Sequence, residues 1–298
     1  MHHNNSKNIV TLIQSPRFVI TILFSSIIIS IFQNLSECLI NHNTLSLPNI
    51  IKLDTLGWTV LSIILMIIIL TIPTILSGMI GWRLNISIFL LIFVLNTLLV
   101  SIEGYFFLSF KDNLFPSFLI RSFRALIITF VILYSSNKLS FRIDKVINTN
   151  TISPYSTTPW SWIWRIVVCL ILYMVLFMVS GVIATNIDFV KSFYQNIKQP
   201  TPGNVFTFIF IRGLLCILVT LPFIRSINIP LLKKALLFGS VIAILGGVKP
   251  LIVPNQMLPP NIRYIHMLEV VISNFLYGII ICFLFGAKIK GKYVNQKI

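Results

Sequence analysis

Eight stretches of this chain are long and apolar enough to cross a lipid bilayer, and this limits its fold more than any other feature. A spanning α-helix needs about 20 mostly apolar residues. Of the 298 residues, 56% are hydrophobic and 10% are charged, whereas a soluble domain has about 25% charged residues. We therefore expect an all-α, polytopic integral membrane helix bundle that forms a single membrane domain over 1–298. The predicted spans are 17–37, 56–80, 84–109, 114–136, 160–183, 204–225, 231–253 and 264–286.

The distribution of Lys and Arg predicts the orientation in the membrane. Loops rich in these residues stay in the cytoplasm. With the N-terminus in the cytoplasm, the cytoplasmic segments carry fourteen of them and the outer segments carry six. Eight spans return the chain to the same side, so both termini and the basic tail 287–298 are predicted to be cytoplasmic. The abundance of Ile, Asn, Phe and Lys favours an AT-rich bacterial genome and hence the bacterial cytoplasmic membrane.

The formal charge of +16 does not indicate nucleic-acid binding, because the basic residues lie between apolar runs rather than on one folded surface. Nucleic acid is therefore not an expected partner, whereas membrane lipids are. The four cysteines form no C-x-x-C pair, so the sequence predicts neither a disulfide framework nor a zinc site. Nothing in the sequence sets the oligomeric state.

The seventh predicted span is unusual at its outer end. Gly246, Gly247 and Pro250 interrupt it there, and broken membrane helices expose backbone groups that a ligand can use. Lys249 beside them is either part of such a site or, together with Lys233 and Lys234, reaches out to the membrane surface.

The outer loop 184–203 holds apolar residues at helical spacing, namely Ile187, Val190, Tyr194 and Ile197. This spacing predicts a short helix on the outer surface. A loop with scattered apolar residues is the alternative.

Five ionisable residues inside the spans are predicted to lie at one depth. At a rise of about 1.5 Å per residue, all five lie roughly 9–15 Å below the outer surface. They come from four different spans, and charged side chains in a membrane usually face the bundle interior or a water-filled cavity. The sequence therefore predicts a polar cluster in the outer half of the bilayer, formed by Glu103, Arg121, Arg124, Arg212 and Glu269.

Helical spacing adds further residues to this cluster. Arg121 and Arg124 share a helix face, and Asn96 lies seven residues before Glu103. His266 begins a polar stripe on the eighth span. We take Glu103, His266 and Glu269 as candidate catalytic residues. The candidate substrate-binding residues are Arg121, Arg124, Arg212, Lys249, Asn96, Ser273 and Tyr277.

Three functions fit this cluster. The first is binding of, or catalysis on, an anionic lipid or lipid-linked substrate, because three arginines face only two glutamates and Arg suits phosphate and carboxylate. The second is a transporter or flippase of an anionic solute or lipid. Comparison of spans one to four with five to eight matches no charged position, so no internal repeat is predicted, which counts against transport.

The third function is a non-catalytic immunity, assembly or anchoring factor. Its charges would only pair within the bundle, Glu103 with Arg121 or Arg124 and Glu269 with Arg212. No metal or other cofactor is expected, because His266 is the only histidine in the predicted spans. A Ser–His–Asp arrangement is not favoured either, since no serine lies in a G-x-S-x-G turn.

Overall fold

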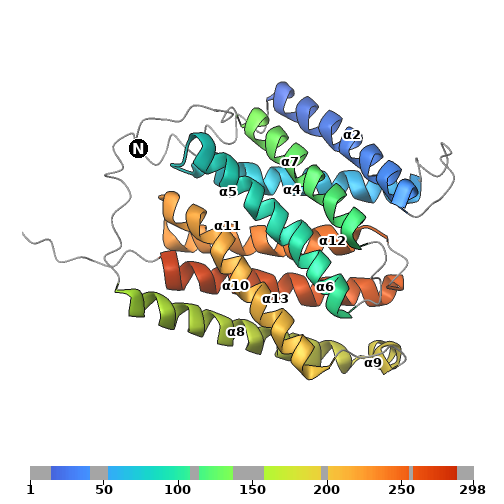
Figure 1. Cartoon of the computed structure of the whole chain (residues 1–298), viewed down its shortest axis with the longest axis vertical. Coiled ribbons are helices and arrows are strands. Elements are labelled where there is room, and N and C mark those ends of the chain that lie inside the picture. The colour runs from blue at the N-terminus through green and yellow to red at the C-terminus, as the bar shows by residue number, and fades with distance from the viewer. Residues whose placement is uncertain are drawn as a thin grey trace, which may run out of the picture.

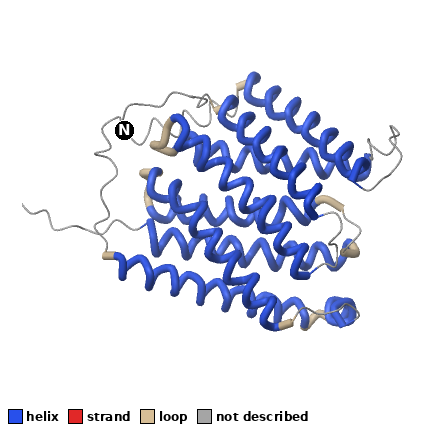
Figure 2. The backbone as a smooth tube through the Cα atoms, viewed as in Figure 1, coloured by secondary structure: helices blue, strands red, loops and turns tan. Residues whose placement is uncertain are grey.

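The computed structural model is helical throughout the parts of the chain that it describes, which are residues 15–40, 53–107, 114–136, 158–195, 201–254 and 258–286 (Figure 2). Eight helices are long and apolar enough to span a membrane. The eight predicted spans are confirmed as helices, with ends that differ by a few residues. The tail 287–298 lies outside the described residues.

The first four spans use six elements. They are α2 (Pro16–Ile40), α4 (Leu53–Leu76), α5 (Gly81–Phe93), η1 (Val94–Leu98), α6 (Leu99–Phe107) and α7 (Leu114–Ser135), where η denotes a π-helical turn. The second span ends at Leu76 rather than at 80, because the chain leaves the helix there to pair with the other half of the molecule. Gly81 then starts α5 with a φ of 60°, which glycine adopts without steric cost.

The last four spans repeat this order. They are α8 (Pro159–Thr185), α10 (Pro202–Ser226), α11 (Leu231–Ala243), η2 (Ile244–Val248), α12 (Lys249–Ile252) and α13 (Pro260–Gly286). Between α8 and α10 lies the short helix α9 (Asp188–Gln195). Its presence confirms the helix predicted in the outer loop, although Ile197 lies outside the described residues.

The two halves have the same order of spanning helices, and around the third span of each half equivalent positions are 150 residues apart. Gly81 and Leu231 begin helices of 13 residues, which continue into π-turns of five residues that begin at Val94 and Ile244. An isolated antiparallel bridge joins Ser77 to Ile227, which are again equivalent positions. The comparison of charged residues missed this repeat, because the halves share helix boundaries and π-turns but not polar side chains.

Contacts between the halves are reciprocal. Helix α4 packs against α11, η2 and α12, and its equivalent α10 packs against α5, η1 and α6. The two π-turns contact each other. Reciprocal contacts of this kind are the mark of a two-fold axis. Because each half has four spans, the chain enters and leaves each half at the same end of the bundle, so the two halves run in the same direction. In Figure 1 the first half fills the upper part of the view and the second half the lower part.

The core lies where the halves meet and continues into each half. Leu95 of η1 and Leu245 of η2 are fully buried at the centre. Helix α8 lies at the edge of the bundle and exposes a long apolar surface, as a helix facing lipid does (Figure 1).

Candidate functional site

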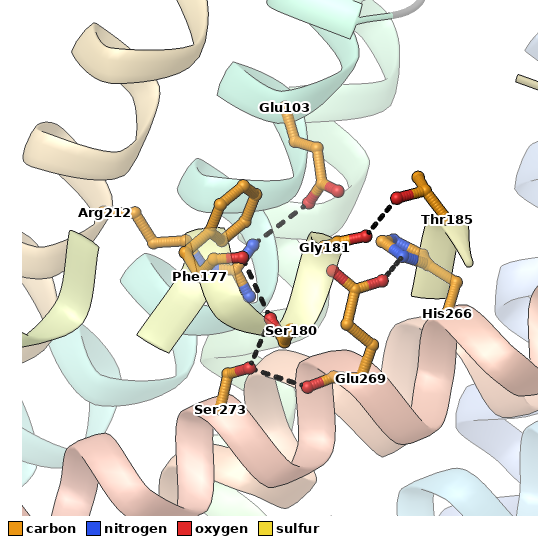
Figure 3. Close-up of polar contacts among 9 residues, drawn as sticks. All are labelled: Glu103, Phe177, Ser180, Gly181, Thr185, Arg212, His266, Glu269 and Ser273. Carbon is orange, nitrogen blue, oxygen red and sulfur yellow. Dashed lines mark hydrogen bonds and ion pairs between the residues drawn. The ribbon is translucent and has the colours of Figure 1, made fainter. Parts of the chain in front are cut away.

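The polar side chains at the interface of the two halves come from four helices. Glu103 of α6 belongs to the first half, whereas Arg212 of α10 and the polar residues of α8 and α13 belong to the second. All lie nearer to the end of the spans that carries α9, which the distribution of Lys and Arg predicts to be the outer end. Figure 3 shows them pointing toward one another. Within this region Arg212 pairs with Glu103, and His266 pairs with Glu269.

Arg212 is the centre of this cluster. Its side chain is buried, with 5% of its surface exposed. One guanidinium nitrogen, Nη1, lies 3.4 Å from Glu103 Oε2, and Nη2 donates to the carbonyl of Gly246 at 3.0 Å. The guanidinium also lies over the ring of Phe208, 5.6 Å from its centroid. Among the described residues, Nε has no hydrogen-bond partner. A guanidinium has five N–H donors, so Arg212 keeps capacity for a further acceptor.

Glu103 is the accessible member of its ion pair, with 35% of its side chain exposed. Its single contact with Arg212 is long for a charge-assisted hydrogen bond, which usually measures about 2.7–2.9 Å. This pair joins the two halves across their interface. Its geometry is that of a weak, partly exposed contact.

His266 and Glu269 form a second pair one helical turn apart on α13. His266 Nδ1 lies 3.2 Å from Glu269 Oε2, and the Glu269 side chain is 12% exposed. Gly181 of α8 faces this carboxylate, since a Cβ placed there would lie 3.8 Å from Oε1. The charges of Glu269 and Glu103 both act on Arg212. In Figure 3 the two carboxylates approach the same region from opposite sides.

Serines connect α13 to α8 below this pair. Ser273 Oγ lies 3.0 Å from Ser180 Oγ and 2.8 Å from the carbonyl of Glu269. Ser180 in turn donates to the carbonyl of Phe177. Ser273 is therefore in the cluster, as the helical spacing predicts.

The short helix α9 lies close to both carboxylates. Burial, together with the negative charges of Glu269 and Glu103, raises the pKa of Tyr194 to about 12. Tyr194 thus keeps its proton at neutral pH. Its hydroxyl group therefore remains a hydrogen-bond donor outside the membrane spans.

A second polar centre lies at the π-turns. Lys249 donates to Asn96 Oδ1 at 2.7 Å, and Asn96 Nδ2 lies 3.3 Å from Met66 Sδ. Lys249 and Asn96 are both buried and come from opposite halves. Gly246 and Gly247 lie in η2, but the predicted break is not present, because the helix continues through this π-turn into α12. The turn η1 forms in the first half without a glycine.

The alternative that the lysines of this span reach the membrane surface is wrong for two of them. Lys249 is buried against Asn96 across the interface. Lys234 is also buried and donates to the carbonyl of Ile224 at 2.9 Å. Both ammonium groups stay inside the bundle because an oxygen there accepts a hydrogen bond from each, the Asn96 amide oxygen for Lys249 and the Ile224 carbonyl for Lys234.

The other predicted binding residues lie elsewhere. Arg124 donates to Gln33 of α2, and the Arg121 carbonyl accepts a hydrogen bond from Thr97. Tyr277 donates to the carbonyl of Gly213 at 2.9 Å and its ring packs on Tyr173. The Tyr277 hydroxyl is therefore used within the bundle.

This distribution corrects the predicted charge balance. Among the described residues the ion pairs are Arg212–Glu103 and His266–Glu269. Pairing of Glu103 with Arg121 or Arg124 was wrong, because α7 directs Arg124 toward α2 rather than toward α6. The cluster thus holds one arginine and one histidine against two glutamates. The excess of arginine that the sequence indicated does not exist at this place.

Sequence reasoning missed three residues near the two centres, namely Ser180, Tyr194 as a neighbour of the glutamates, and Asn274. It also missed Gln33, the partner of Arg124 on α2. Asn274 lies one residue after Ser273 and is fully buried. A search for uncharged amides inside the spans would have found it. Within the described ranges, no three His, Cys, Asp or Glu side chains gather in a way that could hold a metal ion.

Comparison with known proteins gives this chain no relative. No protein-family model matches it, and neither a curated protein nor a solved structure is significantly similar to it.

Proposed function

We propose that this chain is a membrane carrier that binds an anionic cargo between its two halves, at Arg212. The cargo is an anionic solute or an anionic lipid or lipid-linked molecule. The observation that carries the proposal is the position of Arg212: a buried cation with an unused Nε donor, at the interface of two halves related by a two-fold axis. Carriers commonly consist of such repeats, with the cargo bound between them.

The repeat changes the balance between the candidate functions. The lack of a visible repeat in the sequence counted against transport. Two halves with reciprocal contacts and a polar interface now favour a carrier over an enzyme, since one half can rock against the other around a fixed site.

The charge balance implies that protons accompany the cargo. Glu103 and Glu269 already outweigh Arg212 if His266 is neutral. A further negative charge in a poorly hydrated site costs several kcal/mol, roughly, unless it is compensated. We propose that the cargo replaces Glu103 on Arg212 and that Glu103 takes up a proton from solvent. Binding then becomes stronger as the pH falls.

An intramembrane enzyme is the second candidate. The contact of 3.2 Å between His266 and Glu269 is its specific support, because a histidine oriented by a carboxylate can act as a general base. Glu103, His266 and Glu269 would transfer protons, and the substrate would enter from the outer leaflet of a bacterial cytoplasmic membrane. Both termini would lie in the cytoplasm.

The first experiment identifies the cargo. The chain is purified in detergent, and anionic molecules that copurify with it are identified by mass spectrometry. We expect wild type to retain an anion that Arg212→Lys loses, because lysine keeps the charge but not the fork of donors. Arg225→Lys is the matched control, since Arg225 lies at the opposite end of its helix. Equal retention by all three proteins would disprove the site.

The second experiment separates transport from catalysis. Proteoliposomes containing the protein and a trapped pH-sensitive dye are mixed with the identified anion, and uptake of the anion and of protons is measured. We expect wild-type vesicles to take up the anion together with protons, so that their interior acidifies, and Glu103→Gln to lose this acidification. Chemical conversion of the anion by wild type, without any uptake, would favour the enzyme. Neither uptake nor conversion would leave the non-catalytic factor as the function.

A further inference from the structure

We infer that the anionic group of the cargo is a carboxylate that binds beside the π-turn η2, between Arg212 Nε and Asn274 Nδ2. This inference rests on the proposed carrier and narrows its cargo. It also assigns a role to Asn274, a residue that carries no charge and lies outside the ion pairs.

Two buried N–H donors support this position. Arg212 Nε and Asn274 Nδ2 are both buried, and neither has a hydrogen-bond partner among the residues that the structure describes. Asn274 is the more deeply enclosed, with 1% of its surface exposed. A buried donor without an acceptor is destabilising, so folded proteins rarely keep one without a reason. Two at the same place point to a ligand with two acceptor oxygens.

Gly246 brings these donors together. A Cβ at this position would lie 2.9 Å from Asn274 Nδ2 and 3.6 Å from Arg212 Nη2. Asn274 from α13 and Arg212 from α10 therefore both approach the backbone at Gly246, where no side chain stands between them. The Gly246 carbonyl already holds Nη2, which turns the guanidinium and fixes the direction of its Nε edge.

The two-fold axis gives an internal comparison for this site. Asn96 is the equivalent of Gly246, and Arg124 is the equivalent of Asn274. In the first half the π-turn carries an amide that accepts from Lys249, and Arg124 donates to Gln33. The unpartnered pair of donors occurs only in the second half, as far as the described residues extend. The scaffold is repeated, but this donor pair is not.

The surrounding charge selects a carboxylate over a phosphate. A carboxylate carries one negative charge and two coplanar acceptors, which two N–H donors can bind together. A phosphate near neutral pH carries up to two charges. Even after the cargo has displaced a protonated Glu103, Glu269 acts on Arg212, so a second negative charge would meet the repulsion of that carboxylate.

The test compares three probes on the purified protein in detergent, namely hexanoate, inorganic phosphate and hexyltrimethylammonium. Affinity is measured from the rise in thermal unfolding temperature with probe concentration. We expect hexanoate to stabilise wild type, and the other two probes to have no effect. Asn274→Leu removes the amide at similar volume. It should weaken hexanoate binding about ten- to hundredfold, which corresponds to one hydrogen bond to a charged group.

A purely structural role for Asn274 predicts a different result. Removing an unpartnered buried donor should then raise the unfolding temperature without altering hexanoate affinity. If Asn274 binds the carboxylate, Asn274→Leu without hexanoate should unfold at the same temperature as wild type or at a higher one. Adding hexanoate should then no longer raise the unfolding temperature of this variant. Thr220→Val, which removes a buried hydroxyl that donates to Cys216 in α10, is the matched control and should keep that rise.

Several outcomes would overturn the inference. They are unchanged hexanoate affinity in Asn274→Leu, no stabilisation of wild type by hexanoate, or equal stabilisation by phosphate. If Asn274→Leu does not fold, Gly246→Ala replaces it, because its Cβ would displace the Asn274 amide. Transport that depends on Arg212 but not on Asn274 would refute this site and keep the carrier. Binding of hexanoate that depends on Asn274, without any transport, would refute the carrier and keep this site.

Discussion

The two halves of the molecule share a scaffold but differ in the residues at their π-turns. In the first half η1 carries Asn96, which accepts a hydrogen bond from Lys249 of the second half. In the second half η2 carries Gly246, whose backbone carbonyl accepts from Arg212. The second half thus supplies both buried cations of the interface. The first half supplies the amide and the more exposed carboxylate, Glu103.

The halves also differ in how closely their helices pack. Helices α11 and α13 touch at Gly239 and Gly278, where a Cβ on Gly278 would lie 2.7 Å from the Gly239 backbone. The equivalent positions in the first half are Phe89 and Ile128, so α5 and α7 meet through side chains. Small residues allow such close approach of membrane helices. The comparison teaches that one order of helices can pack through glycine backbone in one half and through side chains in the other.

The largest expected effect tests this packing difference. Gly278→Ala should destabilise the protein by about 3 kcal/mol or more, because the new methyl group meets backbone that cannot move aside. Thermal unfolding in detergent, followed by size-exclusion chromatography, measures the loss. Gly57→Ala is the matched control, since nothing lies within 4 Å of its Cβ. Ile128→Val, at the equivalent place in the first half, should cost about 0.5–1.5 kcal/mol.

If Gly278→Ala is tolerated as well as Gly57→Ala, the close helix contact does not hold the second half together. The comparison of the halves would then reduce to their polar residues.

The next effect concerns the hydrogen bond between the π-turns. Asn96→Leu removes the acceptor of the buried Lys249 and should cost about 1.5–3 kcal/mol. The double variant with Lys249→Met should recover most of this loss, since two apolar side chains leave no buried charge behind. A double-mutant cycle on unfolding temperatures gives the coupling between the two positions. Additive losses would mean that the two side chains do not interact.

The smallest effect concerns α9, which is described only in the second half. Because the pKa of Tyr194 is raised to about 12, the unfolded chain loses this proton first as the pH rises. The folded state is therefore fully favoured below about pH 10, and its stability declines from there to about pH 12. Tyr194→Phe should lack this part of the decline.

Unfolding temperatures of wild type and Tyr194→Phe at pH 9 and pH 11 give the measurement. An identical decline in both proteins would place Tyr194 away from Glu103 and Glu269, and α9 would then have no part in the site.

The candidate site was partly predictable. The depth of Glu103, Arg212 and Glu269 follows from helix rise and span boundaries, and the structure brings these residues together. The sequence could not predict that Arg124 lies outside this site. Depth places a residue along a helix, whereas its direction depends on which neighbour that helix packs against, and α7 packs against α2.

The sequence by itself determined the eight spanning helices and the level of the charged residues along them. These depend on hydropathy and a fixed rise per residue, which are local properties of the chain. Only the tertiary structure decided the two-fold repeat, the pairing of Glu103 with Arg212, and the convergence of Arg212 with Asn274. These depend on which helices cross at the axis, and hydropathy does not encode that choice, because every spanning helix is apolar on most of its surface.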